Sequence, residues 1–131
     1  MMTKQEHISW WKLTASKDWE AVDSLLKGKN YVQALFWAHL VLEKLLKAHW
    51  IKDNKEDNPP KTHNLIKLTE HISLTFSESE KRFLEKMNDF QLEGRYPEYI
   101  NNIYKIYNKK QTTIILEQVQ ELRTCLLKNL P

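Results

Sequence analysis

The stretch from Tyr31 to Leu68 places the tightest constraint on how this chain can fold. It opens with a long, mostly apolar segment, YVQALFWAHLVLEKLLKAHWI, passes through a charged loop that contains Pro59-Pro60, and continues with Thr-His-Asn-Leu at residues 62–65. Apolar residues recur at three- and four-residue spacing in the first segment, which is the period of an α-helix. Two successive prolines cannot continue that helix. The stretch therefore predicts a long buried helix, a loop and the start of another helix.

The helical period recurs along the rest of the chain, and cap and turn residues between the periodic runs set the expected boundaries. Only two glycines and four prolines are present, which is too little turn chemistry for a many-stranded sheet. The region from Gln91 to Gln111 is expected to be irregular. We expect one domain over residues 1–131 with five helices. The first helix should end at Gly28, and the second should run from Asn30 to about Ile51. Thr62 should cap the third, which reaches about Ser73; the fourth should begin at Ser77 or Ser79 and end at Gly94, and the last should begin at Thr112 or Thr113.

Charge and cysteine content limit the class of protein. The net charge of +3 comes from many residues of both signs, which is typical of a solvated surface and gives no general nucleic-acid signal. The single cysteine excludes an intrachain disulfide and fits a reducing compartment. Lys or Glu interrupts every apolar run well before the roughly 20 residues of a membrane span, and the N-terminal residues do not resemble a signal peptide. We expect a soluble, cytoplasmic protein.

Three polar side chains share one stripe of the apolar second helix. His39, Glu43 and Lys47 follow one another at four-residue spacing, so they can interact in series. A charge on such a helix is costly unless it is paired. Glu43 is therefore expected either to make a partly buried polar contact at a dimer seam or to line a binding cleft.

The region from Gln91 to Gln111 interleaves tyrosines with Lys and Arg. Such side chains can stack on bases and neutralise phosphates. The alternative is that Tyr99, Ile103 and Tyr107, which are helically spaced, simply pack this segment onto the bundle. Arg95 can clamp a phosphate with two hydrogen bonds, or it can bond loop carbonyls. Both readings of the region stay open from the sequence.

His63 follows the expected helix cap at Thr62. A helix N-terminus attracts anions and disfavours the cationic form of a histidine, so His63 is a candidate phosphate contact. The alternative is that it fixes the loop by hydrogen bonding. A metal site is not expected, because no Glu is followed by a His three residues later and His39 with Glu43 lack a third ligand. No cofactor is predicted.

The order of these features resembles the HEPN domain family of prokaryotic helical proteins over roughly residues 10 to 130. The residues that carry the resemblance are Tyr31, Ala34, Phe36 or Trp37, Glu43, Lys44, Leu46, Lys47-Ala48, Pro59-Pro60, Thr62-His63-Asn64-Leu65 and Arg95-Tyr96-Pro97. The resemblance implies an up-and-down bundle of four to five helices, usually a symmetric homodimer with a cleft near its interface. It also implies a small nucleotidyltransferase as partner, often in a toxin-antitoxin pair.

Many members of this family are metal-independent endoribonucleases with an Arg, a polar residue and then a His four to six residues after the Arg. None of Arg82, Arg95 and Arg123 is followed by a histidine at all. A general acid-base histidine therefore cannot stand at that spacing, and we do not expect this type of enzyme. A rearranged site that joins His39 or His63 with Arg95 across a dimer is the remaining route to ribonuclease activity.

The sequence thus predicts a HEPN-like module that interacts with a nucleotidyltransferase or binds a nucleotide or RNA. The expected ligand-binding residues are Arg95, Tyr96, His63, Lys47, Glu43 and His39. The alternatives are a ribonuclease toxin with a degenerate Arg/His site and a purely structural dimer. A homodimer is also expected on physical grounds, because a bundle of this size has difficulty covering the whole of an apolar second helix, including Phe36, Trp37, Leu40 and Trp50.

Overall fold

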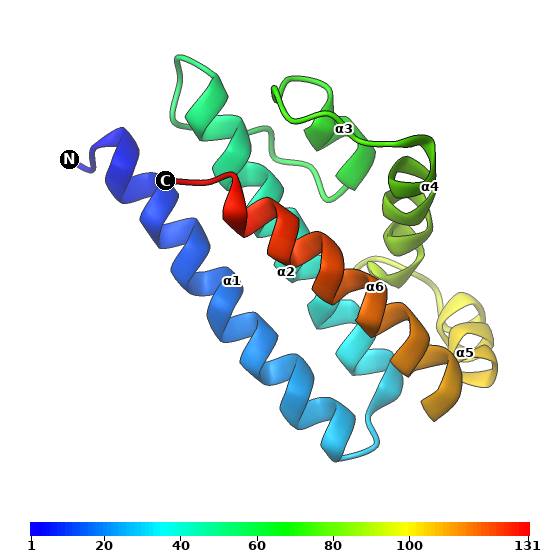
Figure 1. The fold of residues 1–131 in the computed structure, drawn as a ribbon. Coiled ribbons are helices and arrows are strands. Elements are labelled where there is room, and N and C mark those ends of the chain that lie inside the picture. Colours follow the sequence, from blue (N-terminus) through cyan, green and yellow to red (C-terminus); the bar gives the residue numbers. More distant parts are fainter.

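Six α-helices and one short 3-10 helix form the computed structural model, which describes residues 1–131 and contains no strand (Figure 1). The predicted all-α bundle is confirmed, with one helix more than expected. Apolar side chains from all of the elements join one core of 26 buried residues. The elements in chain order are α1 (Lys4–Lys27), α2 (Tyr31–Asp53), α3 (Leu65–Thr69), α4 (Glu78–Met87), η1 (Asn88–Phe90), α5 (Pro97–Ile106) and α6 (Lys109–Lys128).

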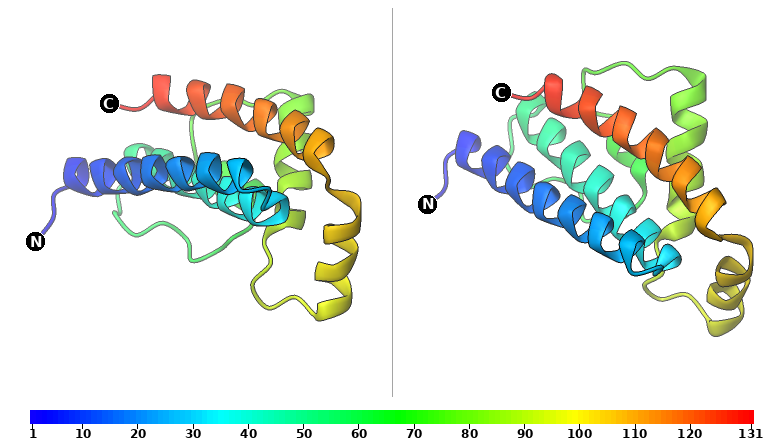
Figure 2. Two further views of the ribbon diagram at one scale, coloured as in Figure 1. Left: turned by 90° about the horizontal axis from the view of Figure 1, so that it is seen from below. Right: turned by 60° about the horizontal axis from the view of Figure 1, so that its bottom comes forward.

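Helix α2 is the central element of the bundle. It contacts α1, α6, α3 and η1, and Figures 1 and 2 show α1 and α6 running along it. Its buried residues come from every side of the helix, as expected for a segment that is apolar nearly all round. An ion pair of 2.6 Å between Asp18 of α1 and Lys44 of α2 adds a polar link between the two longest helices.

One chain covers most of α2 by itself. Phe36, Trp37, Leu40 and Trp50, for which a partner's cover was expected, are half-buried within the single chain. The most exposed large apolar side chains lie elsewhere, in the N-terminal residues and on or beside α1, α5 and α6: Met1, Met2, Trp10, Leu13, Tyr96, Tyr104, Ile106 and Ile114. A surface for a partner is therefore to be sought away from α2.

The first two helices have the predicted boundaries. Gly28 occupies the C-cap of α1, and the left-handed residue that follows is Lys29, with a φ of 63°. Asn30 occupies the N-cap of α2, although its side chain makes no capping bond there. At the other end of α1, Thr3 and Glu6 form a capping box, which fixes the start of the helix.

Both predicted boundaries of the third helix are wrong. The cap of α3 is Asn64 rather than Thr62, and the helix ends at Thr69, before the expected Ser73. The Asn64 side chain accepts from the backbone N–H groups of Ile66 and Lys67, whereas Thr62 accepts from the N–H of Asn64 itself. Threonine and asparagine are both favoured at helix N-caps. The side-chain geometry shows that Asn64 is the cap.

The fourth helix is shorter than expected, and the irregular region contains a helix. Helix α4 ends at Met87 and η1 at Phe90, so Gly94 ends no helix but takes a left-handed φ of 75° in the loop. Helix α5 then begins at Pro97, a position where proline is favoured because the first N–H of a helix has no partner. Burial of Ile103 on one side stabilises this helix.

The last helix starts earlier than predicted, at Lys109. Asn108 caps it by accepting from the N–H of Gln111 at 3.0 Å. Thr112, one of the two predicted caps, is fully buried one turn inside the helix, where its hydroxyl has no hydrogen-bond partner. None of the helices in the structure is long and apolar enough to cross a membrane.

The position of Thr112 gives a stability test of this boundary. We expect Thr112→Val to leave the free energy of unfolding unchanged or to raise it by about 1 kcal/mol, because a buried hydroxyl without a partner only costs desolvation. Asn108→Ala should lower that free energy by about 1 kcal/mol through loss of the cap. Urea unfolding of both variants, with the half-exposed Thr113→Val as control, makes the comparison. A loss for Thr112→Val as large as that for Asn108→Ala would contradict the boundary.

Candidate functional site

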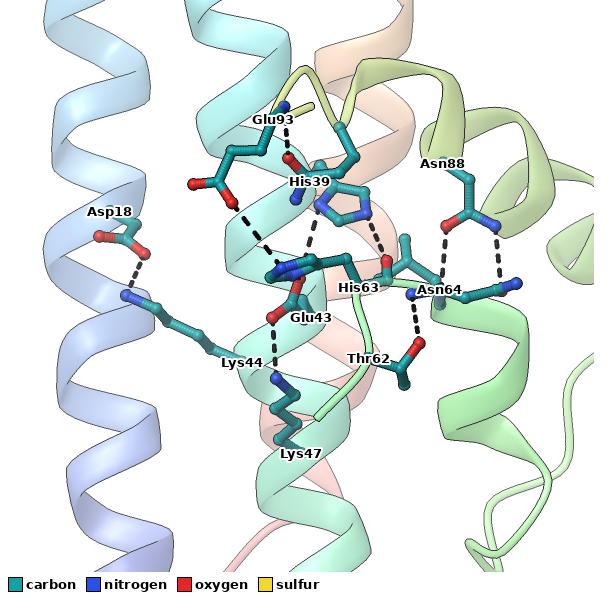
Figure 3. Close-up of polar contacts among 12 residues, drawn as sticks. Asp18, His39, Glu43, Lys44, Lys47, Thr62, His63, Asn64, Asn88 and Glu93 are labelled. Atoms are coloured by element: carbon teal, nitrogen blue, oxygen red, sulfur yellow. Dashed lines mark hydrogen bonds and ion pairs between the residues drawn. The ribbon is translucent and has the colours of Figure 1, made fainter. Parts of the chain in front are cut away.

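The loop between α2 and α3 folds back onto α2 and brings His63 to the polar stripe of that helix (Figure 3). His63 Nδ1 lies 2.9 Å from Glu43 Oε1, and Lys47 Nζ donates to Glu43 Oε2 at the same distance. His39 Nε2 lies 2.9 Å from the backbone carbonyl oxygen of His63. The predicted series of His39, Glu43 and Lys47 is thus extended by a residue from a distant part of the sequence. We call these four residues the Glu43 network.

The Glu43 network consists of three buried residues and one exposed residue. His39, Glu43 and Lys47 are each less than a tenth exposed, and the Lys47 ammonium lies 5.4 Å from the centre of the Trp11 ring. The side chain of His63 is 53% exposed. Glu43 is therefore a buried, paired charge, and only His63 can meet a ligand from solvent.

His39 is a neutral anchor for the loop. Its Nε2 must carry a proton, because a carbonyl oxygen can only accept a hydrogen bond. Its Nδ1 has no hydrogen-bond partner and lies 3.8 Å from Glu43 Oε1. Burial lowers the pKa of His39 below its usual value, and the attraction of Glu43 only partly offsets this effect.

His63 is oriented by the carboxylate behind it. Glu43 accepts from Nδ1, so Nε2 is the nitrogen that remains for a ligand or a proton. The carboxylate of Glu93, which is mostly exposed, lies 3.8 Å from this Nε2. The bond to Glu43 holds the imidazole of His63 in one orientation.

A polar hollow of about 220 Å³ opens beside His63 and is lined by His63, Asn64, Asn88, Gln91 and Arg95. Arg95 is held in place by its own loop: its Nε donates to the Gln91 carbonyl at 3.2 Å and its Nη2 to the Asn88 carbonyl at 3.5 Å. Its guanidinium also lies 4.2 Å from the centre of the Tyr99 ring. The expected bonding to loop carbonyls is therefore present, and it leaves further guanidinium N–H groups free for a ligand.

The start of α3 does not supply the anion site that was considered for His63. The N–H of Leu65 donates to Asn88 Oδ1 at 2.9 Å, and the next two N–H groups donate to Asn64 Oδ1. The N–H of Leu68 donates to the Asn64 carbonyl. All four N–H groups of the first turn are occupied, so any anion in the hollow has to be held by side chains.

The tyrosines of the 91–111 region divide into two groups. Tyr99 donates to the Asp89 carbonyl at 2.7 Å, and the Tyr107 ring packs edge-on against Phe90 at 4.9 Å. Together with the buried Ile103, they attach α5 to the bundle, which agrees with the packing alternative. Tyr96, at the N-cap of α5, is 79% exposed. It remains available to a ligand next to Arg95.

Four residues of the site were not predicted: Asn64, Asn88, Gln91 and Glu93. Asn64 could have been recognised as a cap, since asparagine is a strong N-cap residue. Asn88 donates to Asn64 Oδ1 and thereby joins η1 to α3, a contact between distant residues that leaves no local pattern. In the chain as described, no group of three or more His, Cys, Asp or Glu side chains is arranged to hold a metal ion.

The comparison with known proteins gives one match. The family model of the HEPN domain matches residues 8–130, nearly the whole chain. At the level of the family, this match supports a nucleotide- or RNA-related or toxin-like module. Neither the curated proteins nor the solved structures contain a significant match.

The buried histidines predict how stability depends on pH. Burial lowers the pKa of both His39 and His49, whereas in the unfolded chain both titrate near the ordinary value of 6.5. Below that pH the unfolded state binds more protons, so the free energy of unfolding should fall as the pH drops from about 7 to 5. Urea unfolding across this range measures the slope.

The contribution of one histidine is isolated by His49→Gln, which should flatten the slope by up to about 1.4 kcal/mol per pH unit. His71→Gln removes an exposed imidazole and should leave the slope unchanged. The same slope for His49→Gln and the unmodified protein would mean that His49 is not held neutral by burial.

Proposed function

Because the chain belongs to the HEPN domain family, we propose that it is a nucleotide- or RNA-binding module whose ligand phosphate lies in the polar hollow beside His63 and Arg95. The proposal rests on the hydrogen-bond donors that line this hollow and lack partners, namely the Gln91 amide nitrogen and the remaining N–H groups of Arg95. We also propose that the module is a homodimer and works with a small nucleotidyltransferase, as members of this family commonly do.

Arg95 is the principal phosphate contact in this proposal. A guanidinium offers more N–H donors than the two that bond the loop carbonyls, and its planar fork matches phosphate oxygens. The Tyr99 ring and the two carbonyls hold Arg95 in place before a ligand arrives. Less side-chain freedom is then lost on binding, which favours affinity.

Gln91 and His63 supply further donors. Gln91 lines the hollow and is 8% exposed, and its amide nitrogen has no hydrogen-bond partner. A buried amide without a partner is costly, so an acceptor oxygen of a ligand would relieve it. A cationic His63 would donate from Nε2 while Glu43 accepts from Nδ1. An anion with several acceptor oxygens, such as a phosphate, suits this set of groups.

Glu93 opposes an anion at its present distance from His63. Its side chain is 69% exposed and lies 3.8 Å from His63 Nε2. The carboxylate can therefore turn away into solvent when a phosphate enters the hollow. Tyr96 is exposed beside Arg95, where its ring can stack on a base. His39 and Lys47 are buried, and in this proposal they position His63 rather than touch the ligand.

A second candidate function is metal-independent RNA cleavage. The supporting observation is that His63 and Arg95 line one hollow within one chain, although the Arg-then-His spacing of the family ribonucleases is absent. In this reaction His63 Nε2 takes the proton of a ribose 2′-hydroxyl, whose oxygen attacks the neighbouring phosphorus. The 5′ oxygen leaves with a proton from water, and Arg95 stabilises the charge on the phosphoryl oxygens. Such an activity would fit a toxin of a toxin-antitoxin pair.

The test of binding is a titration with ATP, other nucleotides and a short single-stranded RNA, followed by intrinsic tryptophan fluorescence. Arg95→Ala and His63→Ala should each weaken binding about tenfold or more, because each removes a charge-assisted hydrogen bond. Lys17→Ala, which removes an exposed charge from α1, is the control and should bind normally. An equal loss for Lys17→Ala would indicate unspecific attraction and contradict the proposed site.

RNA integrity in the same samples separates the two candidate functions. Binding with intact RNA supports the binding module, and cleavage that His63→Ala abolishes supports the ribonuclease. If neither binding nor cleavage occurs, the nucleotide proposal fails, and a structural dimer or a protein partner remains. The nucleotidyltransferase partner is tested separately, by co-expression with such a protein encoded beside this gene.

Glu93→Gln should raise the affinity for a nucleotide several-fold. The substitution removes the carboxylate that competes for His63 Nε2 and keeps the shape of the side chain. Because Glu93 is exposed, it should leave the free energy of unfolding nearly unchanged. Glu98→Gln, on α5, is the matched control. Unchanged or weaker binding by Glu93→Gln would contradict an anion at His63.

A further inference from the structure

A groove of about 860 Å³ lies between α1 and α6 and shares no lining residue with the polar hollow. Four apolar side chains, Trp19, Val22, Leu26 and Leu116, contribute to its lining. Helices α1 and α6 both pack on α2, and direct contacts between the two are few. The space between them is thus the place that one more element of a helical bundle would fill.

The charged residues that line this groove are all of one sign, although the Arg123 guanidinium lies 5.2 Å from the centre of the Trp19 ring. Every charged residue that lines it is acidic: Glu20 and Asp23 from α1, and Glu117 and Glu121 from α6. Asp23 has an ion-pair partner, Lys27, at 2.9 Å, and the other three have none. Since the chain as a whole has a net charge of +3, this acidity is a local feature. An occupant with apolar side chains and positive charges would suit both the lining and the rim.

The chain itself carries exposed apolar and basic residues where α5 meets α6. Tyr104 and Ile106 are 48% and 57% exposed, although the Tyr104 hydroxyl also accepts a hydrogen bond from Gln33 of α2. Lys105, Lys109 and Lys110 lie beside them in the sequence, all exposed and none of them in an ion pair. We call these five residues the basic corner. Figure 2 shows α5 at the end of the bundle, next to the start of α6. The residues of α6 that line the groove begin at Thr113.

We propose that the basic corner of a second copy of this chain occupies the acidic groove, and that the contact is reciprocal. Corner and groove are neighbours along α6, so a two-fold axis near the start of α6 can bring each corner to the groove of the other copy. Such a closed, self-complementary contact is the commonest form of homodimer. It would cover the exposed Tyr104 and Ile106 and pair lysines with unpaired carboxylates.

This inference specifies the interface of the dimer proposed above and uses none of the residues that line the polar hollow. The test is sedimentation velocity over micromolar concentrations, with helix content followed by circular dichroism. Glu117→Lys with Glu121→Lys, and separately Lys109→Glu with Lys110→Glu, should each weaken the dimer about tenfold or more, because like charges would then face each other. Combining all four substitutions exchanges two lysines and two glutamates between the surfaces, keeps the net charge, and should restore the dimer.

The control is Lys55→Glu with Lys61→Glu in the exposed loop before α3. This variant has the same change of net charge as Lys109→Glu with Lys110→Glu and should leave the dimer intact. A dimer that is insensitive to both charge reversals, or one that the four combined substitutions fail to restore, would overturn this interface while leaving the proposed homodimer in place. A monomer at all concentrations would overturn both. Neither result bears on nucleotide binding, which is measured in the hollow.

Discussion

The candidate site depends on one buried charge, the carboxylate of Glu43 in the middle of α2. A carboxylate in that position is tolerable only with partners, and Lys47 and His63 provide them at 2.9 Å each. The contact with His63, together with the bond from His39 to the His63 carbonyl, fixes the end of the loop that leads to α3. Removing Glu43 would therefore leave a buried ammonium unpaired and release the accessible imidazole at the same time.

The rest of the hollow follows from where that loop is fixed. With His63 held on α2, Asn64 caps α3 and meets Asn88 of η1. The carbonyls of Asn88 and of Gln91, the residue after η1, hold Arg95. His63 and Arg95, which are far apart in the sequence, thereby line the same hollow. Hydrogen bonds to the carboxylate of Glu43 and to two backbone carbonyls, rather than a helix N-terminus, position these donors. The arrangement favours recognition of an anion by prearranged side chains.

How much of this the sequence reveals differs between the fold and the site. The period of α2 is unambiguous because the helix is buried on every side, and the four-residue spacing of His39, Glu43 and Lys47 predicts their contact. The starts of α3 and α6 were misplaced because two cap-forming residues lie close together in each case, Thr62 with Asn64 and Asn108 with Thr112, and tertiary packing chooses between them. The contacts of His63 with Glu43 and of Asn64 with Asn88 join distant residues, for which a single sequence has no periodic signal.

The most direct test of the account is an NMR titration with AMP and with inorganic phosphate, in which the imidazole C–H resonances of the histidines are followed. We predict saturable shifts for His63, smaller ones for the buried His39 behind it, and none for the exposed His71, which follows the C-terminal end of α3 and does not line the hollow. Equal shifts of His63 and His71, or no shift of His63 at millimolar ligand, would contradict the claim that the hollow is an anion site.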